Sequence, residues 1–164
     1  MGLAVFGGVA LTMVKSGLPW QHRRMSEARV RGLNHLTLAV ADLDRSVAFY
    51  RDLLGCELRA IWAEGAYLEA GSLWLCLSVD DKARDARRPD YTHYAFDVAA
   101  DQFQPLAARV RQSAPLWKVD VSEGVSLYFL DPDGHRLELH VGTLASRLDH
   151  YRSSSQSPVR LIGG

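Results

Sequence analysis

Side chains alternate between apolar and polar from Leu33 to Val40, and this period of two predicts a β-strand. Asp42 can then cap a helix whose apolar residues recur at spacings of three and four until Gly55 ends the pattern. Short apolar segments separated by Gly-containing turns follow, and each predicts another strand. The first module is therefore expected to be βαβββ, with strands over residues 33–40, 57–62, 66–70 and 73–78.

The same order of elements returns after a charged linker, Asp80 to Asp90. A strand is predicted over Thr92–Val98, and we expect Asp101 to cap the helix that follows, with Pro105 in its first turn. The remaining predicted elements are strands over residues 116–119, 125–130 and 136–141 and a helical stretch over 144–150.

Two histidines occupy matching places in the two modules. His35 and His93 are 58 residues apart, and Val40 and Val98 have the same separation. Together with the repeated order of elements, this spacing favours a duplication. We therefore predict an α+β fold in which two βαβββ modules, residues 32–79 and 91–142, form a curled mixed sheet around a cleft.

The ends of the chain differ in composition from the predicted domain, residues 32–150. Residues 1–31 contain five basic residues and one acidic residue, and we expect them to be a disordered extension. The apolar run at their start is shorter than the roughly 18 to 20 residues needed to span a bilayer, so no membrane segment is predicted. Residues 151–164 are polar and are expected to form a loose C-terminal tail.

Charge and cysteine content narrow the classes of partner and location. The 164 residues hold 19 Lys and Arg against 19 Asp and Glu, without a basic run, so a nucleic-acid partner is not expected. Cys56 and Cys76 have no CxxC context, which favours a reduced, cytoplasmic setting.

Histidines on an inward strand face are either core residues or metal ligands. For one histidine the core interpretation is the better one, but equivalent positions in paired modules can bring His35 and His93 to a shared cleft. A carboxylate is expected as the third ligand, and Glu138 is the candidate because an ionised carboxylate in mid-strand needs compensation. His140 competes for that place, since it shares a face with Glu138.

The turn before that strand, Asp131-Pro132-Asp133-Gly134, contains further polar residues. His135 is expected to belong to this turn, and Asp131 and Asp133 to serve its geometry. Two imidazoles and one carboxylate would leave coordination positions open for a substrate, and this ligand set suits Mn, Fe, Co, Ni or Zn alike.

The residues from 32 to 150 resemble a known family. The opening from Gly32 to Gly55 is similar to the glyoxalase, or vicinal oxygen chelate, superfamily. More specifically, the segments LWLCLS (residues 73–78), THYAF (92–96) and YFLDPDGHRLELHVG (128–142) resemble the manganese-dependent fosfomycin-resistance glutathione transferases. The LWLCLS and THYAF segments are much more specific than the PDGH turn, which is widespread in the superfamily.

The resemblance implies a metal-assisted reaction. His35, His93 and Glu138 would bind Mn²⁺, which would chelate fosfomycin, and the thiolate of glutathione would open the epoxide ring. Thr37 would donate a hydrogen bond to the epoxide oxygen, and Tyr67 would handle the glutathione thiol. The residues that the resemblance places around the substrate are Lys118 and Arg147 at the phosphonate, and Trp74, Tyr91 and Tyr128 in an aromatic pocket.

The loop of residues 122–126 resembles the potassium-binding loop of that family. Ser122 and Ser126 would flank a K⁺ ion that adds positive potential beside the phosphonate, whereas the bare sequence predicts only a turn. Val121 stands where close relatives usually carry arginine, and Glu64 stands where an uncharged polar residue is common. Both changes remove attraction for an anionic thiol, so the identity of the thiol is left open.

The resemblance also implies a homodimer, in which modules are often exchanged between chains. The leading hypothesis is a cytoplasmic enzyme that adds glutathione to fosfomycin. One alternative is a sibling enzyme that uses water or another thiol, or acts on another small oxyanion. Another is a protein that binds a drug or metabolite without catalysis. The presence of Thr37, Lys118 and Arg147 favours turnover over binding alone.

Overall fold

The computed structural model describes residues 29–85, 90–119, 124–154 and 159–162. The chain divides into two compact units, Met1–Gly32 and Leu33–Gly164. In the first unit, the described residues 29–32 belong to no helix or strand, and the rest of the expected extension lies outside the described residues.

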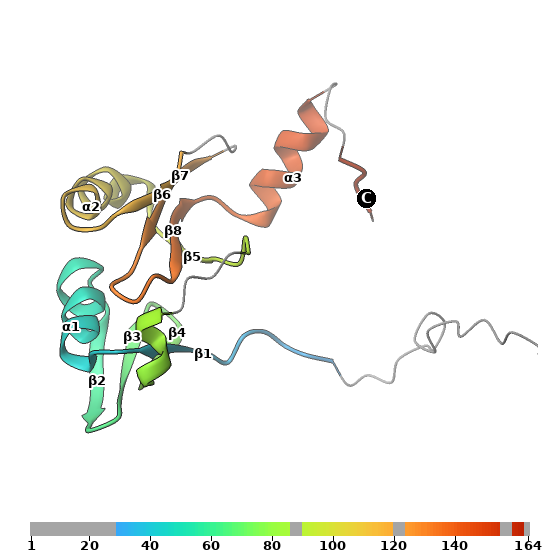
Figure 1. Ribbon diagram of the computed structural model, residues 1–164. Coiled ribbons are helices and arrows are strands. Elements are labelled where there is room, and N and C mark those ends of the chain that lie inside the picture. The colour runs from blue at the N-terminus through green and yellow to red at the C-terminus, as the bar shows by residue number, and fades with distance from the viewer. Residues whose placement is uncertain (1–28, 86–89, 120–123, 155–158, 163–164) are drawn as a thin grey trace, which may run out of the picture. The chain divides into compact units, whose positions relative to one another are not determined.

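The first module is a four-stranded mixed sheet with one helical segment (Figure 1). The strands lie in the order β1-β4-β3-β2, with β1 parallel to β4 and the other pairs antiparallel. Asp42 caps α1 as predicted, because its side chain accepts a hydrogen bond from the backbone N–H of Arg45. The elements are β1 (His35–Val40), α1 (Leu43–Ala48), the π-helical turn η1 (Phe49–Leu53), β2 (Glu57–Trp62), β3 (Gly65–Ala70) and β4 (Leu73–Val79).

The second module repeats this topology. Its sheet has the order β5-β8-β7-β6, again with one parallel pair, β5 and β8. The predicted α+β fold of two βαβββ modules is therefore confirmed, although the two sheets are not joined into one. The elements are the short linker helix η2 (Asp81–Asp85), β5 (Tyr94–Asp97), α2 (Ala100–Ser113), β6 (Leu116–Lys118), β7 (Val125–Leu130) and β8 (Arg136–Val141).

Two details of the second module differ from the prediction. The helix α2 begins before Asp101, because Ala99 is extended and its carbonyl accepts the backbone N–H groups of Gln102 and Phe103. Asp101 is thus a first-turn residue and not the cap, and Pro105 lies in the second turn. The strand β5 begins at Tyr94, so His93 immediately precedes the strand that was predicted to contain it.

One hydrophobic core includes residues of both modules. Each sheet turns one face towards its own helix, and Leu38, Leu75, Phe129 and Leu137 are among the fully buried side chains of those faces. The rings of Phe49 and Phe129 pack 6.4 Å apart across the two modules. The opposite face of each sheet is left for polar and aromatic side chains, and it carries the candidate site.

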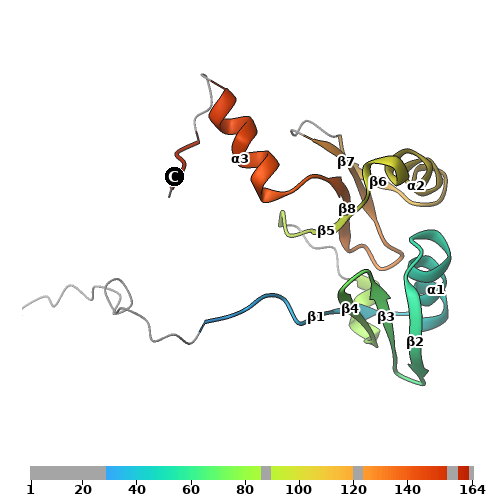
Figure 2. The ribbon, with the colours of Figure 1, turned by 180° about the vertical axis from the view of Figure 1, so that it is seen from behind.

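Among the described residues, β1 and β5 each lie at one edge of their sheet and are paired on one side only, with β4 and with β8. After β8, the helix α3 (Leu144–Ser153) leads away from the second sheet (Figure 2) and has no buried residue. It extends three residues beyond the end predicted at residue 150. Among the described residues, no helix combines the length and the apolar character needed to cross a bilayer.

Candidate metal centre and substrate site

The first sheet presents an aromatic row on its polar face. Strand pairing places His35 beside Trp74 and Thr37 beside Cys76, and Cys76 in turn pairs with Tyr67. The ring of His35 lies 4.8 Å from that of Trp74, and the ring of Trp74 lies 5.0 Å from that of Tyr67. Trp74 and Tyr67 are each 38% exposed, and the Nδ1 of His35 bonds at 2.9 Å to the side chain of Asn34. This face therefore offers aromatic surface and one accessible imidazole.

The second sheet brings His93 and Glu138 into direct contact. The Nε2 of His93 lies 3.0 Å from Oε2 of Glu138, although the residues are 45 positions apart. The Nδ1 of His93 lies 3.0 Å from the backbone carbonyl oxygen of Tyr91. Glu138 is only 6% exposed, so its carboxylate is removed from water and needs compensation.

The His93–Glu138 contact suits a metal ion. The carbonyl of Tyr91 can only accept, so Nδ1 of His93 carries the hydrogen of the neutral ring and Nε2 turns its lone pair to the carboxylate. The lone pairs of Nε2 and Oε2 repel each other at this distance unless a proton or a metal ion lies between the two atoms. Two ligands about 2.1 Å from an octahedral divalent ion are themselves about 3 Å apart. The carbonyl behind the imidazole is a typical outer partner of a ligating histidine.

Ser126 and His140 complete the polar side of Glu138. The Oγ of Ser126 lies 2.7 Å from Oε1 of Glu138 and 2.8 Å from Nδ1 of His140. His140 and Glu138 do share a face of β8, as the alternation of that strand predicted. Each oxygen of the carboxylate therefore has a polar neighbour, Ser126 at Oε1 and His93 at Oε2.

Lys118 lies among aromatic rings next to this cluster. Its Nζ is 4.4 Å from the ring centroid of Tyr128 and 4.9 Å from that of Tyr91, and it donates a short hydrogen bond to the Tyr91 hydroxyl. That hydrogen bond, more than any other cause, raises the pKa of Lys118 above its usual value, so the residue stays cationic. A permanent positive charge here suits an anionic ligand.

The predicted site residues fall into two groups, one on each module. Thr37 lines a pocket of about 570 Å³ with Ser78, whereas Lys118, Ser126 and Tyr128 line another of about 550 Å³. Over the described residues, which include His35, no three His, Cys, Asp or Glu side chains gather closely enough to hold a metal ion. Within one chain, His93 and Glu138 meet and His35 is elsewhere.

Trp117 is a site residue that the sequence reasoning missed. Its ring lies 5.9 Å from that of His93 and 5.3 Å from that of Tyr128, and its Nε1 donates to the carbonyl of Leu137 at 3.2 Å. A break in the β6–β7 register falls at this residue, which is why alternation along the strand could not place it. Its position next to Lys118 in the sequence was the available signal.

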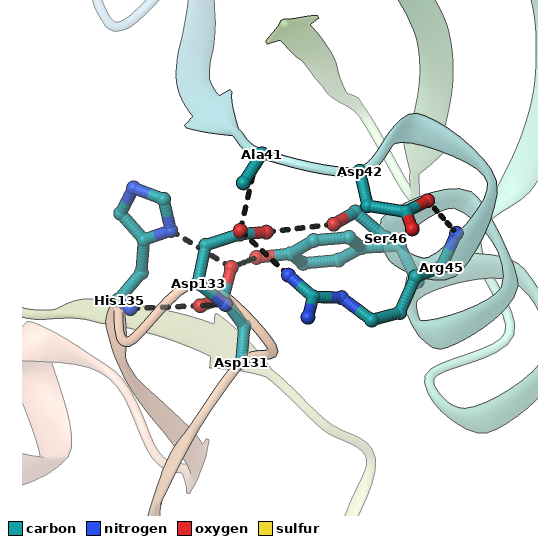
Figure 3. Close-up of polar contacts among 8 residues, drawn as sticks. Ala41, Asp42, Arg45, Ser46, Asp131, Asp133 and His135 are labelled. Atoms are coloured by element: carbon teal, nitrogen blue, oxygen red, sulfur yellow. Dashed lines mark hydrogen bonds and ion pairs between the residues drawn. The ribbon is translucent and has the colours of Figure 1, made fainter. Parts of the chain in front are cut away.

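Side chains of the turn between β7 and β8 form hydrogen bonds both within the turn and to residues outside it (Figure 3). Asp131 accepts from the backbone N–H groups of Asp133 and His135 and from Nδ1 of His135, so it has the predicted role in the turn. It also accepts the hydroxyl hydrogen of Tyr50 at 2.8 Å, and burial foremost raises the pKa of Tyr50 well above its usual value.

Asp133 links the turn to the first module. Its carboxylate accepts hydrogen bonds from the backbone N–H of Ala41 at 2.9 Å, from Nη2 of Arg45 at 2.8 Å and from the hydroxyl of Ser46 at 2.7 Å. The expectation that Asp133 serves only turn geometry was therefore incomplete. Its side chain is 1% exposed, and these contacts fasten the start of β8 to the loop before α1 and to α1 itself.

The other predicted residues lie on other elements or outside the described residues. Arg147 lies in the first turn of α3, where its backbone N–H bonds to the carbonyl of Thr143. Glu64 is exposed in the turn between β2 and β3. Ser122 and Val121 lie outside the described residues.

Comparisons with known proteins agree on the family. The model of the Glyoxalase/Bleomycin resistance protein/Dioxygenase superfamily matches residues 32–139. The chain is 56% identical over 122 residues to the glutathione transferase FosA of Serratia marcescens, covering 73% of this chain and 86% of that one. It is 38% identical over 128 residues to the metallothiol transferase FosB of Lysinibacillus sphaericus, covering 75% and 91%.

A solved structure supports the same assignment. The fosfomycin resistance protein FosX of Listeria monocytogenes, in a variant complexed with Mn(II) and 1S,2S-dihydroxypropylphosphonic acid, matches with a TM-score of 0.63 and 28% identity. The match covers 73% of this chain and 99% of that chain. With its two βαβββ modules and this family match, the chain belongs to the Glyoxalase/Bleomycin resistance protein/Dioxygenase superfamily.

Proposed function

We propose that this protein inactivates fosfomycin by adding the thiol of glutathione to its epoxide, with Mn²⁺ as the activating metal. The observation that carries the proposal is the buried His93–Glu138 pair, set beside the cationic, aromatic surroundings of Lys118. The 56% identity to a glutathione transferase and the Mn(II) in a related fosfomycin resistance protein support the same chemistry.

Different residues of this chain have different roles in the proposed reaction. His35, His93 and Glu138 would hold the metal, which would supply a Lewis acid for the negative charge on the epoxide oxygen. Thr37 donates a hydrogen bond to that oxygen as the carbon–oxygen bond breaks. The attacking sulfur loses its proton near Tyr67 and forms the new carbon–sulfur bond, and the released oxygen gains a proton to become a hydroxyl.

The substrate's phosphonate needs cations and hydrogen-bond donors. Lys118 and Arg147 provide charge, and Ser122 and Ser126 flank a K⁺ ion that adds positive potential beside the phosphonate. Trp74, Tyr91 and Tyr128 form the aromatic walls against the apolar part of the drug. The manganese, the potassium and a cytoplasmic location remain predictions for this chain.

A homodimer with exchanged modules accounts for the place of His35. Both β1 and β5 are edge strands with one side open among the described residues, and His35 begins one while His93 precedes the other. Pairing β1 of one chain beside β5 of a second chain would bring the two histidines to one seam and cover both edges. The exposed Trp74 and Tyr67 would then face the partner's Lys118 pocket.

Water addition to the same epoxide is the second candidate. The related FosX structure contains a dihydroxypropylphosphonic acid, which is the diol expected when water opens the oxirane. Glu64 and Val121 also lack the positive charge that favours anionic glutathione. Binding without catalysis is the remaining alternative.

Mass spectrometry of fosfomycin incubated with the protein and Mn²⁺ separates these alternatives. Parallel reactions would contain glutathione, cysteine or no thiol, each with and without K⁺. A glutathione adduct is expected. A diol formed in every reaction would show that the protein adds water to the epoxide and does not transfer a thiol. Unchanged drug in all of the reactions would contradict both enzymatic proposals.

Substitution of the ligands tests the metal site directly. His93→Ala should abolish both Mn²⁺ binding and adduct formation. His150→Ala is the matched control, because His150 lies exposed on α3, and it should retain both. Turnover that persists in His93→Ala would show that the ligand assignment is wrong.

A further inference from the structure

Ser126 stands between Glu138 and His140 on the polar face of the second sheet. Ser126 and His140 are direct partners in the β7–β8 ladder, and Glu138 is two residues earlier on β8. The hydroxyl contacts both neighbours, at 2.7 Å and 2.8 Å, and Ser126 and Glu138 are 5% and 6% exposed. Water therefore has little access to the hydrogen bonds between them.

The number of hydrogens fixes the direction of these bonds. An ionised carboxylate only accepts, so the single hydroxyl hydrogen of Ser126 goes to Oε1 of Glu138. Ser126 must then accept from His140, which requires the hydrogen of the neutral imidazole on Nδ1. His140 thereby holds the serine hydroxyl in the rotamer that donates to Glu138.

Two glycines keep the imidazole of His140 in this orientation. Gly124 and Gly142 both have positive φ, +90° and +150°. A Cβ added at Gly142 would lie 2.9 Å from Nε2 of His140, and one added at Gly124 would lie 3.0 Å from its Cε1. The ring thus occupies a slot between two stretches of bare backbone, and its Nε2 edge has little room for a ligand.

We propose that His140 is a positioning residue for the metal site. It acts through Ser126, which fixes Oε1 of Glu138 and leaves Oε2 facing His93. The inference rests on the proposed role of Glu138 as a metal ligand. It also gives His140 a different place from the one considered in the sequence, since the ring orients a ligand and does not replace it. Outer partners of this kind typically change metal affinity by about 10- to 100-fold.

The test measures Mn²⁺ affinity by electron paramagnetic resonance of the free ion, which needs no turnover. In His140→Asn the amide N–H can take the place of Nδ1–H, whereas His140→Leu has nearly the same shape and no donor. We expect His140→Leu to weaken Mn²⁺ binding about tenfold and His140→Asn to stay within about twofold of the wild type. Circular dichroism of both variants checks that they are folded.

A double-mutant cycle with Ser126→Ala tests the route of the effect. If His140 acts through the serine, His140→Leu should cost almost nothing further once Ser126→Ala is present. His140→Gln, whose amide lies too far out to reach Ser126, replaces His140→Leu in the cycle should that variant not fold.

Three results would overturn the inference while leaving the proposed function intact, and the first two concern His140→Leu and the double-mutant cycle. One is equal Mn²⁺ affinity of His140→Leu and wild type, and the other is an additive loss in the cycle. Equal losses in the Asn and Leu variants would also overturn it, because they would show that ring bulk matters and the donor does not. A wild-type protein that binds no Mn²⁺ would overturn the proposed function, and this inference with it.

Discussion

The two modules have the same topology, yet their equivalent histidines have different surroundings. His35 is exposed and its ring bonds to the side chain of its neighbour Asn34, whereas His93 is held by the Tyr91 carbonyl and faces a buried carboxylate. The second module thus contains two of the three proposed ligands in a preorganised arrangement. The first contributes one ligand from an edge strand, which can be supplied by another chain. The two modules therefore share one topology but contribute unequally to the proposed metal site.

Mixing two inactive variants is the strongest test of that division. His35→Ala and His93→Ala should each abolish turnover. If each site combines the first module of one chain with the second module of its partner, a mixed dimer has one site with both substitutions and one intact site. With about half of the dimers mixed, about one quarter of wild-type activity should return. Activity is measured after co-refolding equal amounts of the two proteins.

A second pair of variants provides the control for that experiment. His93→Ala and Glu138→Gln both alter the second module, so every site in their mixture is damaged and no activity should return. His35→Ala mixed with Glu138→Gln should recover as the first pair does. No recovery in the first pair would place all three ligands within one chain or exclude the dimer, and recovery in the control pair would mean that His93 and Glu138 of one site come from different chains.

Asp133→Asn should lower the free energy of unfolding, because it weakens the contacts that join the two modules. The substitution removes the charge paired with Arg45 and weakens the bonds to Ala41 and Ser46. Arg45 is half exposed, so we expect a loss of about 2 to 3 kcal/mol in the free energy of unfolding, somewhat below the usual value for a broken buried pair. Urea unfolding measures it. Asp52→Asn, which removes an exposed carboxylate paired with Arg51, should leave stability unchanged.

Alkaline pH should destabilise the protein through the first module. Burial raises the pKa of Cys56 to about 11 and raises that of Tyr50 well above its usual value, so both keep their protons when folded. The unfolded thiol and phenol ionise earlier, and stability is therefore full below about pH 9 and falls as the pH rises towards 11. Urea unfolding at several pH values should show this fall. It should be shallower in Cys56→Ala and Tyr50→Phe, and an unchanged slope would contradict the assignment.

The smallest expected effect concerns the thiol. Glu64 is exposed at the β2–β3 turn of the first module, where we expect it to repel an anionic co-substrate. Glu64→Gln should lower KM for glutathione about two- to fivefold, with kcat unchanged, in line with a single exposed charge. The KM for fosfomycin is the internal control. A higher KM for glutathione would mean that Glu64 assists binding.

Local patterns were sufficient for the elements but not for contacts distant in sequence. Alternation predicted the strands that carry His35 and Glu138, and it put Glu138 and His140 on one face. It could not place Trp117, since the register of β6 and β7 shifts there, nor the start of α2, which is capped by backbone alone. The partners of Asp133 were also beyond reach, because Ala41, Arg45 and Ser46 lie about 90 residues away.

The anchoring of the β7–β8 turn extends the set of residues on which antibiotic protection depends. Asp133 fastens the start of β8 to the first module, and Glu138 lies five residues further along the same segment. A genetic screen for bacteria that regain drug sensitivity should accordingly recover substitutions at Ser46 and Tyr50, in the helical segment of the other module, together with those at Glu138. Such substitutions would change the orientation of the Glu138 carboxylate, although the substituted residues would contact neither the drug, the thiol nor the metal.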